Sequence, residues 1–250
     1  MQTTIYKPED EQRLMSILWN TTLRDNPLAF VKYLFPWGVK DTPLEHFSGP
    51  RKWQREVLQD ITDHIAENNQ LKNNSSTGAV NFSTGAVSNQ EIMYRVLQEA
   101  ISSGRGIGKS ALVSWLTIWM LSTRIGSTTI ISANSENQLR SITWAEITKW
   151  LAMALNSHWF EVSATRVAPA KWLTELVEQD LKKGTRYWGV EGRLWSAENP
   201  DAYAGVHNYD GVLVIFDEAS GIDDTIWAVT GGFFTENTPN RFWLAFSNPR

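Results

Sequence analysis

The sequence predicts an α/β protein in which a mostly parallel central sheet is flanked by helices and preceded by an N-terminal helical subdomain. Three observations predict this fold. Strand, loop and helix patterns alternate through residues 98–155, which is the rhythm of a doubly wound sheet. A glycine-rich stretch at residues 103–110 joins an expected strand to a long apolar helix. Finally, the apolar run 212–216 leads directly into Asp217 and Glu218.

The composition is that of a globular chain. Its 250 residues, 42% of them hydrophobic, can bury a sizeable core, in which we expect most of the 13 tryptophans. The 23 basic and 27 acidic residues leave a net charge of −4, so any nucleic-acid contact has to be local. The sequence has no cysteine, which excludes disulfides and cysteine–zinc sites, and its four histidines are scattered.

Nothing in the sequence predicts membrane association. The polar and acidic first 13 residues do not form a signal peptide. The longest apolar run, at residues 111–121, is too short to span a bilayer. We therefore expect a soluble, intracellular protein.

The N-terminal subdomain is expected over residues 1–67. A short helix is predicted at residues 9–19, and Asn26 followed by Pro27 predicts the N-cap and first residue of a second one. Apolar residues recur on one stripe through residues 51–67, which favours a helix packed on the core.

Residues 68–90 are predicted to form a flexible surface loop or a short hairpin because Asn, Ser, Thr and Gly dominate them. The pentapeptide Ser-Thr-Gly-Ala-Val occurs at residues 76–80 and again at 83–87. Two copies are too few for a solenoid. A nucleotide-binding core is then expected over residues 91–250.

The core begins with a strand at residues 98–102. The helix after the glycine-rich stretch is apolar almost all round, so it is expected to be buried, and it should end at Arg124 with Gly126 as the C′ residue. A β-branched strand follows at residues 128–132.

The rest of the core continues the same rhythm. Ser135 and Gln138 have the spacing of a capping box for the next helix, whose pattern continues to Leu155. Further elements are expected as strands at residues 160–167, 186–190 and 241–246 and as a helix at residues 172–181.

The glycine-rich stretch predicts a phosphate-binding loop. The residues expected to cradle phosphate are Ser103, Gly104, Gly106, Ile107, Gly108, Lys109 and Ser110. Lys109 would reach the β- and γ-phosphates, and the Ser110 hydroxyl would bind Mg²⁺. Ser103 stands where the usual pattern has glycine. A turn that only joins a strand to a helix is the alternative, although the Lys-Ser ending has no role in a turn.

Gln54 is a candidate for recognising adenine. In many ATP-driven nucleic-acid motors a glutamine in an aromatic–glutamine context precedes the phosphate loop, and its amide can both donate to and accept from the base. A glutamine on a helix surface is usually solvated, so both interpretations stay open.

Asp217 and Glu218 form the second candidate half of the site. A buried parallel strand that ends in two acids places both carboxylates beside the ligand crevice. Asp217 could hold the Mg²⁺ shared with Ser110, and Glu218 could orient and partly deprotonate an attacking water. This pair favours a hydrolysing motor over kinases and GTPases. The alternative is a solvated acidic loop.

Ser247 and Asn248 follow the last expected strand. Small polar side chains at a strand end could sense the γ-phosphate and signal its loss. A plain strand-to-loop turn would look similar.

Together, Ser-Gly-Arg-Gly-Ile-Gly-Lys-Ser at 103–110, Ile-Phe-Asp-Glu-Ala-Ser at 215–220 and Phe-Ser-Asn-Pro at 246–249 resemble the large terminase subunit of tailed phages. That family is the ATP-driven DNA-packaging motor. The resemblance covers the chain from about Trp53 onward.

The resemblance implies a P-loop NTPase fold of the additional-strand, catalytic-glutamate type, with ATP and Mg²⁺ as cofactors. It also implies that Arg105 acts on the γ-phosphate, unless Arg105 is a solvent-facing loop residue. Ser247 and Asn248 match the family's coupling motif, which links hydrolysis to DNA movement. Arg140 and Arg193 are candidates for an arginine that acts in trans.

The implied partners are double-stranded DNA, the portal protein of the procapsid and the small terminase subunit. The implied assembly is a homo-oligomeric ring in the host cytoplasm, with no membrane. The family normally continues into a nuclease domain, which we expect to be absent from this chain, so no nuclease activity is expected from it alone.

Two other functions fit the same motifs. A helicase-like remodelling ATPase shares the phosphate loop and the acidic pair, and a nucleotide-gated scaffold would bind nucleotide without turnover. Stimulation by procapsids separates the packaging motor from the helicase, and turnover separates it from the scaffold.

Overall fold

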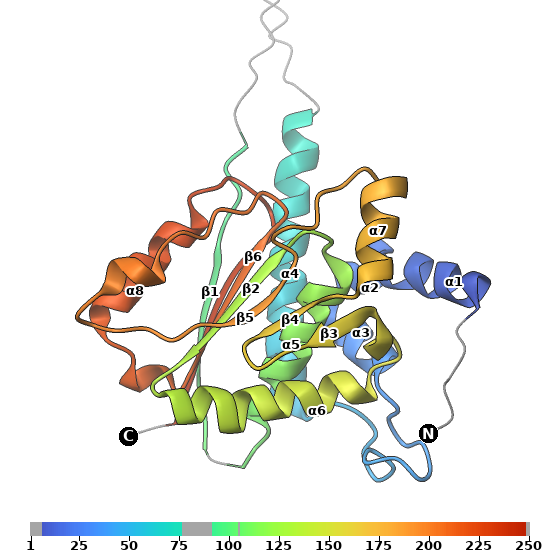
Figure 1. The fold of residues 1–250 in the computed structure, drawn as a ribbon, viewed down its shortest axis with the longest axis horizontal. Helices are drawn as coiled ribbons and strands as arrows, with labels where there is room; N and C mark the ends of the chain where they lie inside the picture. Colours follow the sequence, from blue (N-terminus) through green and yellow to red (C-terminus); the bar gives the residue numbers. More distant parts are fainter. Residues whose placement is uncertain (1–6, 77–91, 105, 249–250) are drawn as a thin grey trace, which may run out of the picture.

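A computed structural model describes residues 7–76, 92–104 and 106–248. Among these residues a seven-stranded sheet forms the centre of the molecule (Figure 1). Its order is β1 (Leu97–Ser102), β7 (Arg241–Ser247), β6 (Val212–Asp217), β2 (Thr128–Ala133), β5 (Gly189–Gly192), β4 (Arg166–Pro169), β3 (Phe160–Val162). In this order the first five strands, β1, β7, β6, β2 and β5, pair in parallel with their neighbours. The pairs β5–β4 and β4–β3 are antiparallel. The predicted mostly parallel sheet is confirmed.

The strand order places β7 between β1, which leads into the glycine-rich stretch, and β6, which ends in Asp217. Ser102 is paired with Ser247, and Asp217 is paired with Phe246. Parallel strands end at the same edge of a sheet, so the predicted site residues lie together there. In the additional-strand fold, an inserted strand separates the strand before the phosphate loop from the strand that ends in the acids. Strand β7 lies between β1 and β6 in this way, so that expectation is confirmed.

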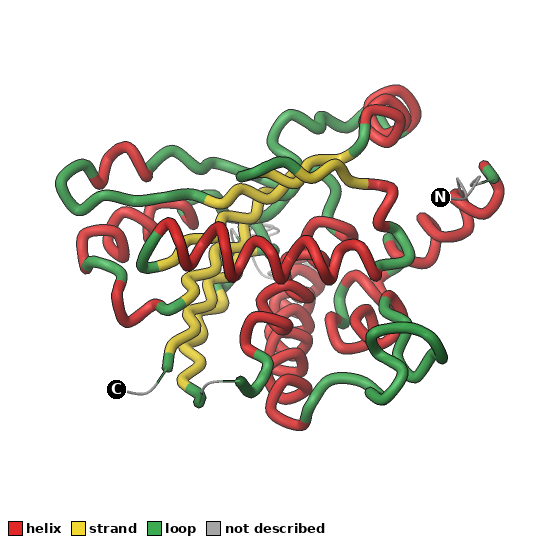
Figure 2. The backbone as a smooth tube through the Cα atoms, turned by 60° about the horizontal axis from the view of Figure 1, so that its bottom comes forward, coloured by secondary structure: helices red, strands yellow, loops and turns green. Residues whose placement is uncertain are grey.

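Helices cover both faces of the sheet (Figures 1 and 2). Their bounds are α1 (Pro8–Leu18), α2 (Thr21–Arg24), α3 (Pro27–Leu34), α4 (Lys52–Ser76), α5 (Lys109–Thr123), α6 (Ala145–Met153), α7 (Lys171–Asp180) and α8 (Asp224–Gly231). A π-helical segment, Gln138–Trp144, leads into α6, and together they cross the molecule near the ends of the parallel strands (Figures 1 and 2).

The side chains of β6 alternate between the two faces of the sheet and contribute to two separate hydrophobic clusters. Leu213 and Ile215 belong to a large hydrophobic cluster with α3, α4, α5 and α6, whereas Val214 and Phe216 belong to a smaller cluster with Ile226 of α8. Successive side chains of a strand point to opposite faces, so one fully buried strand supplies both clusters.

Helix α5 lies at the centre of the larger cluster. Thirteen of its 15 residues are buried, which confirms the expectation of a helix covered on several sides. Trp115 and Trp119 are among them, and Trp144, Trp150, Trp159 and Trp188 are also buried. The six partly buried tryptophans that pack against the two clusters are Trp19, Trp37, Trp53, Trp195, Trp227 and Trp243. Most of the tryptophans therefore serve the core, as predicted.

The N-terminal helices form much as the sequence predicts. The Asn26 side chain accepts a hydrogen bond from the Ala29 N–H at 2.8 Å, and Pro27 begins α3. The expected helix at residues 51–67 is longer than predicted, because α4 continues to Ser76. The prediction of a loop from residue 68 is therefore wrong for residues 68–76, and residues 77–91 lie outside the described residues.

Asn68 explains why the helix continues past the predicted boundary. Its side chain is buried, and its amide bonds to the Arg95 N–H at 3.0 Å, the Arg95 carbonyl at 3.1 Å and the Pro239 carbonyl at 3.2 Å. An asparagine whose amide joins distant segments does not compete with its own helix backbone. At Asn68, the polar side chain that favoured a loop is used for tertiary hydrogen bonds instead.

Two other predictions need correction, and one helix was not predicted. Residues 160–167 are not one strand but the antiparallel pair β3 and β4, which turn at Ser163, whose N–H bonds to the Arg166 carbonyl at 2.8 Å. The strand expected at residues 186–190 is β5 at 189–192. Helix α8 was not predicted, although Asp223 caps it by accepting from the Thr225 N–H at 2.9 Å.

The end of α5 is close to its predicted place. Arg124 is the C-cap residue, so Ile125 is the C′ residue, and Gly126, which was predicted at C′, lies one residue further on. Gly126 has a φ of +87°, and a Cβ there would lie 2.2 Å from a carboxylate oxygen of Asp210. Within the described ranges, no helix is long and apolar enough to cross a membrane.

Glu99 on β1 gives the stability of the fold a pH dependence. Burial, and to a lesser degree the charge of Asp60, raises the pKa of Glu99 from 4.5 to about 7, and its Oε2 has no hydrogen-bond partner among the described residues. Between these pKa values the folded protein holds a proton that the unfolded chain has lost. Stability from this group is therefore lost as the pH rises from 4.5 to 7.

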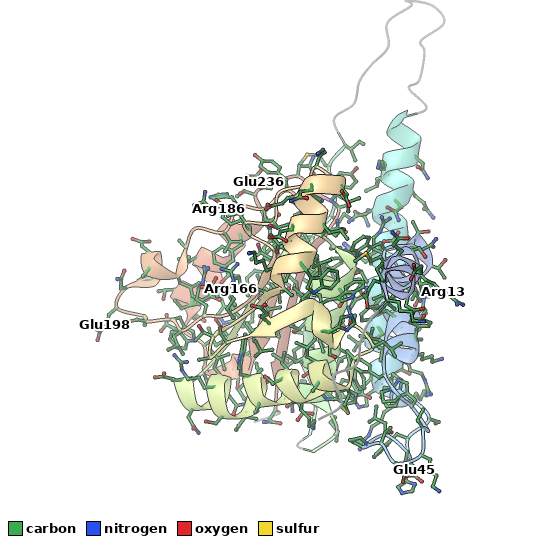
Figure 3. All side chains as sticks on the ribbon, turned by 45° about the vertical axis from the view of Figure 1, so that its right-hand side comes forward. Arg13, Glu45, Arg166, Arg186, Glu198 and Glu236 are labelled. Atoms are coloured by element: carbon green, nitrogen blue, oxygen red, sulfur yellow. The ribbon has the colours of Figure 1, made fainter. Side chains whose placement is uncertain are left out.

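We predict that Glu99→Gln removes this loss. Its melting temperature should exceed that of the wild type by about 2–4 °C at pH 8 and match it at pH 5, measured by circular dichroism. Glu198→Gln is the control, since Glu198 is exposed on a surface loop (Figure 3). An equal gain at both pH values would contradict the prediction.

Candidate active site

A cleft of about 650 Å³ lies at the carboxyl edge of the parallel strands. Its lining includes seven of the predicted residues, Gly104, Gly106, Gly108, Lys109, Ser110, Glu218 and Asn248. Asn134, Gln138, Ile142 and Glu146 form another part of the wall. The cleft has the volume of a small-molecule ligand site.

The loop before α5 has the backbone that its glycines predict. Gly106 and Gly108 have φ values of +71° and +96°, and Gly108 is the N-cap residue of α5. A side chain on Gly108 would be strained, because L residues rarely adopt its φ and a Cβ there would lie 2.8 Å from Gln54 Nε2. The N-terminus of a 15-residue helix consequently opens into the cleft, where its dipole favours an anion.

Helix α4 holds this loop from behind. Gln54 Nε2 donates to the Gly108 carbonyl at 2.8 Å, and Trp53 Nε1 donates to the Ile107 carbonyl at 3.3 Å. Gln54 Oε1 accepts from the Arg51 N–H at 2.8 Å, and the side chain is 2% exposed. Both ends of the Gln54 amide therefore bond to backbone, which gives it a supporting contact with the loop. Adenine recognition by Gln54 stays a prediction.

Lys109 is buried and surrounded by oxygen acceptors. Its Nζ donates to the Ser103 carbonyl at 2.7 Å, to the Gly104 carbonyl at 3.2 Å and to Asn248 Oδ1 at 2.5 Å. All three acceptors are neutral, and no ion pair with a described carboxylate balances the charge. A buried ammonium held only by neutral groups favours an anionic ligand in the adjoining cleft.

Asp217 ends β6 and is 2% exposed. Its Oδ1 accepts from the Glu218 N–H at 3.1 Å, and its Oδ2 accepts from Thr143 Oγ1 at 2.5 Å and from Gln138 Nε2 at 3.2 Å. Gln138 also lines the cleft, so Asp217 lies just behind the cleft wall. These three hydrogen bonds orient the carboxylate, and carboxylate oxygens are ligands that Mg²⁺ prefers.

Glu218 has the left-handed backbone conformation, with φ 53° and ψ 45°. Few residues other than glycine adopt it, and such residues concentrate at functional sites. The conformation turns the chain sharply at the end of β6, and Glu218 reaches the cleft wall. Its Oε1 accepts from Asn248 Nδ2 at 2.7 Å.

Asn248 therefore connects the two predicted halves of the site. One end of its amide accepts from Lys109 and the other donates to Glu218. Ser247 holds the strand end beside the loop, because its carbonyl accepts from the Ser103 N–H at 3.1 Å. The hydroxyl of Ser247 points back to the Asn248 carbonyl at 3.2 Å.

The remaining predicted residues differ in their surroundings. Ser110 lines the cleft, and Arg105 lies outside the described residues. Arg140 pairs with Glu136 at 2.6 Å, and Arg193 bonds to Glu191 and to the Tyr203 carbonyl, so both arginines have partners in their own chain. Their role in trans stays a prediction.

The residues at the cleft fit a nucleotide with Mg²⁺. Ser103 Oγ is buried without a partner among the described residues, Lys109 carries an unbalanced charge, and Ser110 and Asp217 offer oxygen ligands. The described residues contain no group of three or more His, Asp or Glu that could hold a metal. Mg²⁺ does not require such a group, since one or two protein oxygens, phosphates and waters complete its shell.

The sequence analysis did not predict that Gln138 and Thr143 contact Asp217. The predicted capping box is half formed, because Ser135 Oγ accepts from the Gln138 N–H at 3.2 Å while the Gln138 side chain turns to Asp217. A glutamine in the segment after β2 is a signal from which a polar contact at this edge of the sheet could have been predicted. Thr143 gave no signal, because the expected α-helical period does not place it beside Gln138.

The strand order, the glycine-rich loop and the strand-end acids define a P-loop NTPase fold of the additional-strand type. In sequence, the chain is 29% identical to the probable terminase large subunit of Enterobacteria phage P7 over 141 residues, or 54% of this chain and 26% of that protein. No family model matches the chain.

The fold is also similar to that of a solved protein. The large terminase of bacteriophage HK97 superposes with a TM-score of 0.53 and 14% identity, over 90% of this chain and 37% of that one. The chain thus resembles large terminase subunits in sequence and in fold, and it spans about a quarter of the matched phage P7 protein and just over a third of the HK97 chain.

We predict that Gly108→Ala damages nucleotide binding, because the added methyl meets Gln54 and alanine disfavours a φ of +96°. The affinity for a fluorescent ATP analogue should fall by at least tenfold, roughly 1.4 kcal/mol. Gly104→Ala is the matched control, since open space surrounds its Cβ position. Equal affinities of the two variants would rule out this account of the loop.

Proposed function

We propose that this protein hydrolyses ATP to power the translocation of double-stranded DNA into a viral procapsid, as the ATPase part of a large terminase subunit. One observation carries the proposal. A single amide, that of Asn248, bonds both to the lysine of a phosphate-type loop and to a strand-end glutamate. That contact joins the group suited to bind phosphate to the group suited to activate water, and the similarity to terminases supports the choice of reaction.

The proposed nucleotide contacts use groups whose surroundings favour anions. The N–H groups at the start of α5 and the Lys109 ammonium bind the phosphates, and Ser110 and Asp217 hold Mg²⁺. When bound, the metal neutralises charge that develops on the phosphates. Gln54 is proposed to contribute to adenine selection, if its amide exchanges a backbone bond for the base.

Glu218 is the proposed general base. Its carboxylate reaches the cleft wall, and its bond from Asn248 leaves Oε2 as the oxygen that can orient a water and accept its proton. Arg105 is proposed to stabilise the charge of the transferred phosphoryl group, in keeping with the position of a cation within the loop.

Ser247 and Asn248 are the proposed coupling residues. A γ-phosphate that approaches Lys109 competes with Asn248 for the ammonium donors, and Asn248 also holds Glu218. Binding and loss of the γ-phosphate would therefore change the hydrogen bond from Asn248 to Glu218 and the position of the end of β7 together. Ser247 fixes that strand end to the loop through the Ser103 N–H.

The wider setting follows the same proposal. The portal protein, the small terminase subunit and double-stranded DNA are the proposed partners, with assembly as a homo-oligomeric ring in the host cytoplasm. A steady-state ATPase assay with and without portal-bearing procapsids tests it. Stimulation by procapsids supports the motor, whereas stimulation only by unwinding substrates would favour a helicase-like remodelling ATPase.

We predict that two substitutions separate binding from hydrolysis. Glu218→Gln should keep ATP binding and lower turnover by about 10²- to 10⁴-fold, because the base is lost. Lys109→Ala should weaken ATP binding itself by about tenfold to a hundredfold, because a charge-assisted contact is lost. Binding is measured with a fluorescent analogue and turnover by phosphate release. Hydrolysis by Glu218→Gln at the wild-type rate would exclude Glu218 as the base.

We also predict that Asn248→Ala loses coupling. ATP binding should stay within about threefold of the wild type, since Lys109 keeps its two carbonyl acceptors. Stimulation of turnover by procapsids and DNA should disappear, measured as the ratio of stimulated to basal rate. Asn199→Ala, at an exposed loop position, is the control. An unchanged ratio in Asn248→Ala would refute the coupling role.

A further inference from the structure

The carboxylate of Asp217 is held from one side by the helix that follows β2. Thr143 Oγ1 lies 2.5 Å and Gln138 Nε2 lies 3.2 Å from Oδ2 of Asp217. Thr143 is 1% exposed, so water does not substitute for its hydroxyl. Thr143 Oγ1 also lies 3.2 Å from the Gln138 carbonyl, but a hydroxyl has one proton, and the shorter contact identifies Asp217 as its acceptor.

The π-helical form of this segment is what brings the two residues together. Gln138 and Thr143 are the first and the sixth residues of the π-helix Gln138–Trp144. In an α-helix a separation of five residues turns the side chains about 140° apart. A π-helix is wound more widely and bonds residue i to residue i+5, which brings residues five apart closer to the same side. Both side chains reach Asp217. An ordinary α-helix here could present one of them, but not both.

These bonds leave the carboxylate with one direction in which to act. A carboxylate has about four lone-pair positions, two on each oxygen. Thr143 and Gln138 occupy both positions on Oδ2, and the Glu218 N–H occupies one on Oδ1. The remaining position is on Oδ1. Rotation of the carboxylate would break three hydrogen bonds, so its orientation is fixed.

We propose that Thr143 and Gln138 are positioning residues for Mg²⁺ binding, which hold Asp217 so that Oδ1 alone is offered to the metal. The proposal rests on the proposed function, since it assumes that Asp217 is a metal ligand. It predicts that loss of the Thr143 hydroxyl weakens metal binding specifically. Groups that orient a metal ligand typically change metal affinity by 10- to 100-fold when they are removed.

The test compares Thr143→Val with Thr143→Ser in the whole chain. Valine keeps the branched shape and removes the hydroxyl, whereas serine keeps the hydroxyl and removes a methyl. Mn²⁺ is the probe, and its dissociation constant in the presence of a non-hydrolysable ATP analogue is measured by electron paramagnetic resonance. We expect Thr143→Val to raise that constant about 10- to 100-fold and Thr143→Ser to leave it near the wild-type value.

Two further measurements separate positioning from general damage. Nucleotide affinity in EDTA should be the same in the wild type and Thr143→Val, because no metal is then held. If Thr143→Val lowered the nucleotide affinity in EDTA as much as it lowers the affinity in the presence of metal, the proposal would be overturned in favour of a structural role. If Thr143→Val does not fold, Gln138→Met replaces it, and an unchanged Mn²⁺ constant in that folded variant overturns the proposal.

The result also distinguishes this proposal from the function on which it rests. A wild-type chain that binds no Mn²⁺ with the nucleotide analogue would refute the metal site itself. A wild-type chain that binds Mn²⁺, together with a Thr143→Val variant that binds it equally well, would refute only the positioning role.

Discussion

The amide of Asn248 is the interaction on which the candidate site depends. Its Oδ1 lies 2.5 Å from Lys109 Nζ, and its Nδ2 lies 2.7 Å from Glu218 Oε1. A primary amide accepts at one end and donates at the other, so it can join a cation to an anion without adding charge. An aspartate at this position would repel Glu218, and a lysine would repel Lys109. The chemistry of the contact therefore requires a neutral amide.

The strand order makes this contact possible. Neighbouring strands are about 4.8 Å apart, so the end of β7 is one strand away from both β1 and β6. Because all three are parallel, their carboxyl ends meet at one edge, where Ser102 is level with Ser247 and Asp217 with Phe246, the residue before Ser247. An antiparallel β7 would carry Asn248 to the opposite edge. The site thus depends on crossover connections, which run through helices on the faces of the sheet.

The sequence predicted those features that depend on local patterns. The continuous apolar run before Asp217, the Gly-Lys-Ser ending of the loop and the Asn26 cap are each readable from a few neighbouring residues, and the strands and helix starts they predict are confirmed. The errors arise where distant contacts override composition. Asn68 joins α4 to Arg95 and Pro239, and Thr143 reaches Asp217 only because the helix adopts the π form. No pattern of period 3.6 contains that information.

A single rule explains both the order of this edge and the place where a ligand would act. Buried polar groups need hydrogen-bond partners, and the chain supplies nearly all of them internally. Lys109 uses its three donors on oxygens, and Asp217 receives three bonds. Single buried atoms at several places in the described residues lack partners, among them Glu99 Oε2 and Trp115 Nε1. At this edge the unused capacity is a lone pair on Asp217, the hydroxyl of Ser103 and the positive charge of Lys109. All three belong to the edge where the cleft lies, and a phosphate with its cation has the complementary charges and oxygens. At this edge a cation, a hydroxyl and a carboxylate with unused bonding capacity occur together, which is the combination that a phosphate with its metal ion requires.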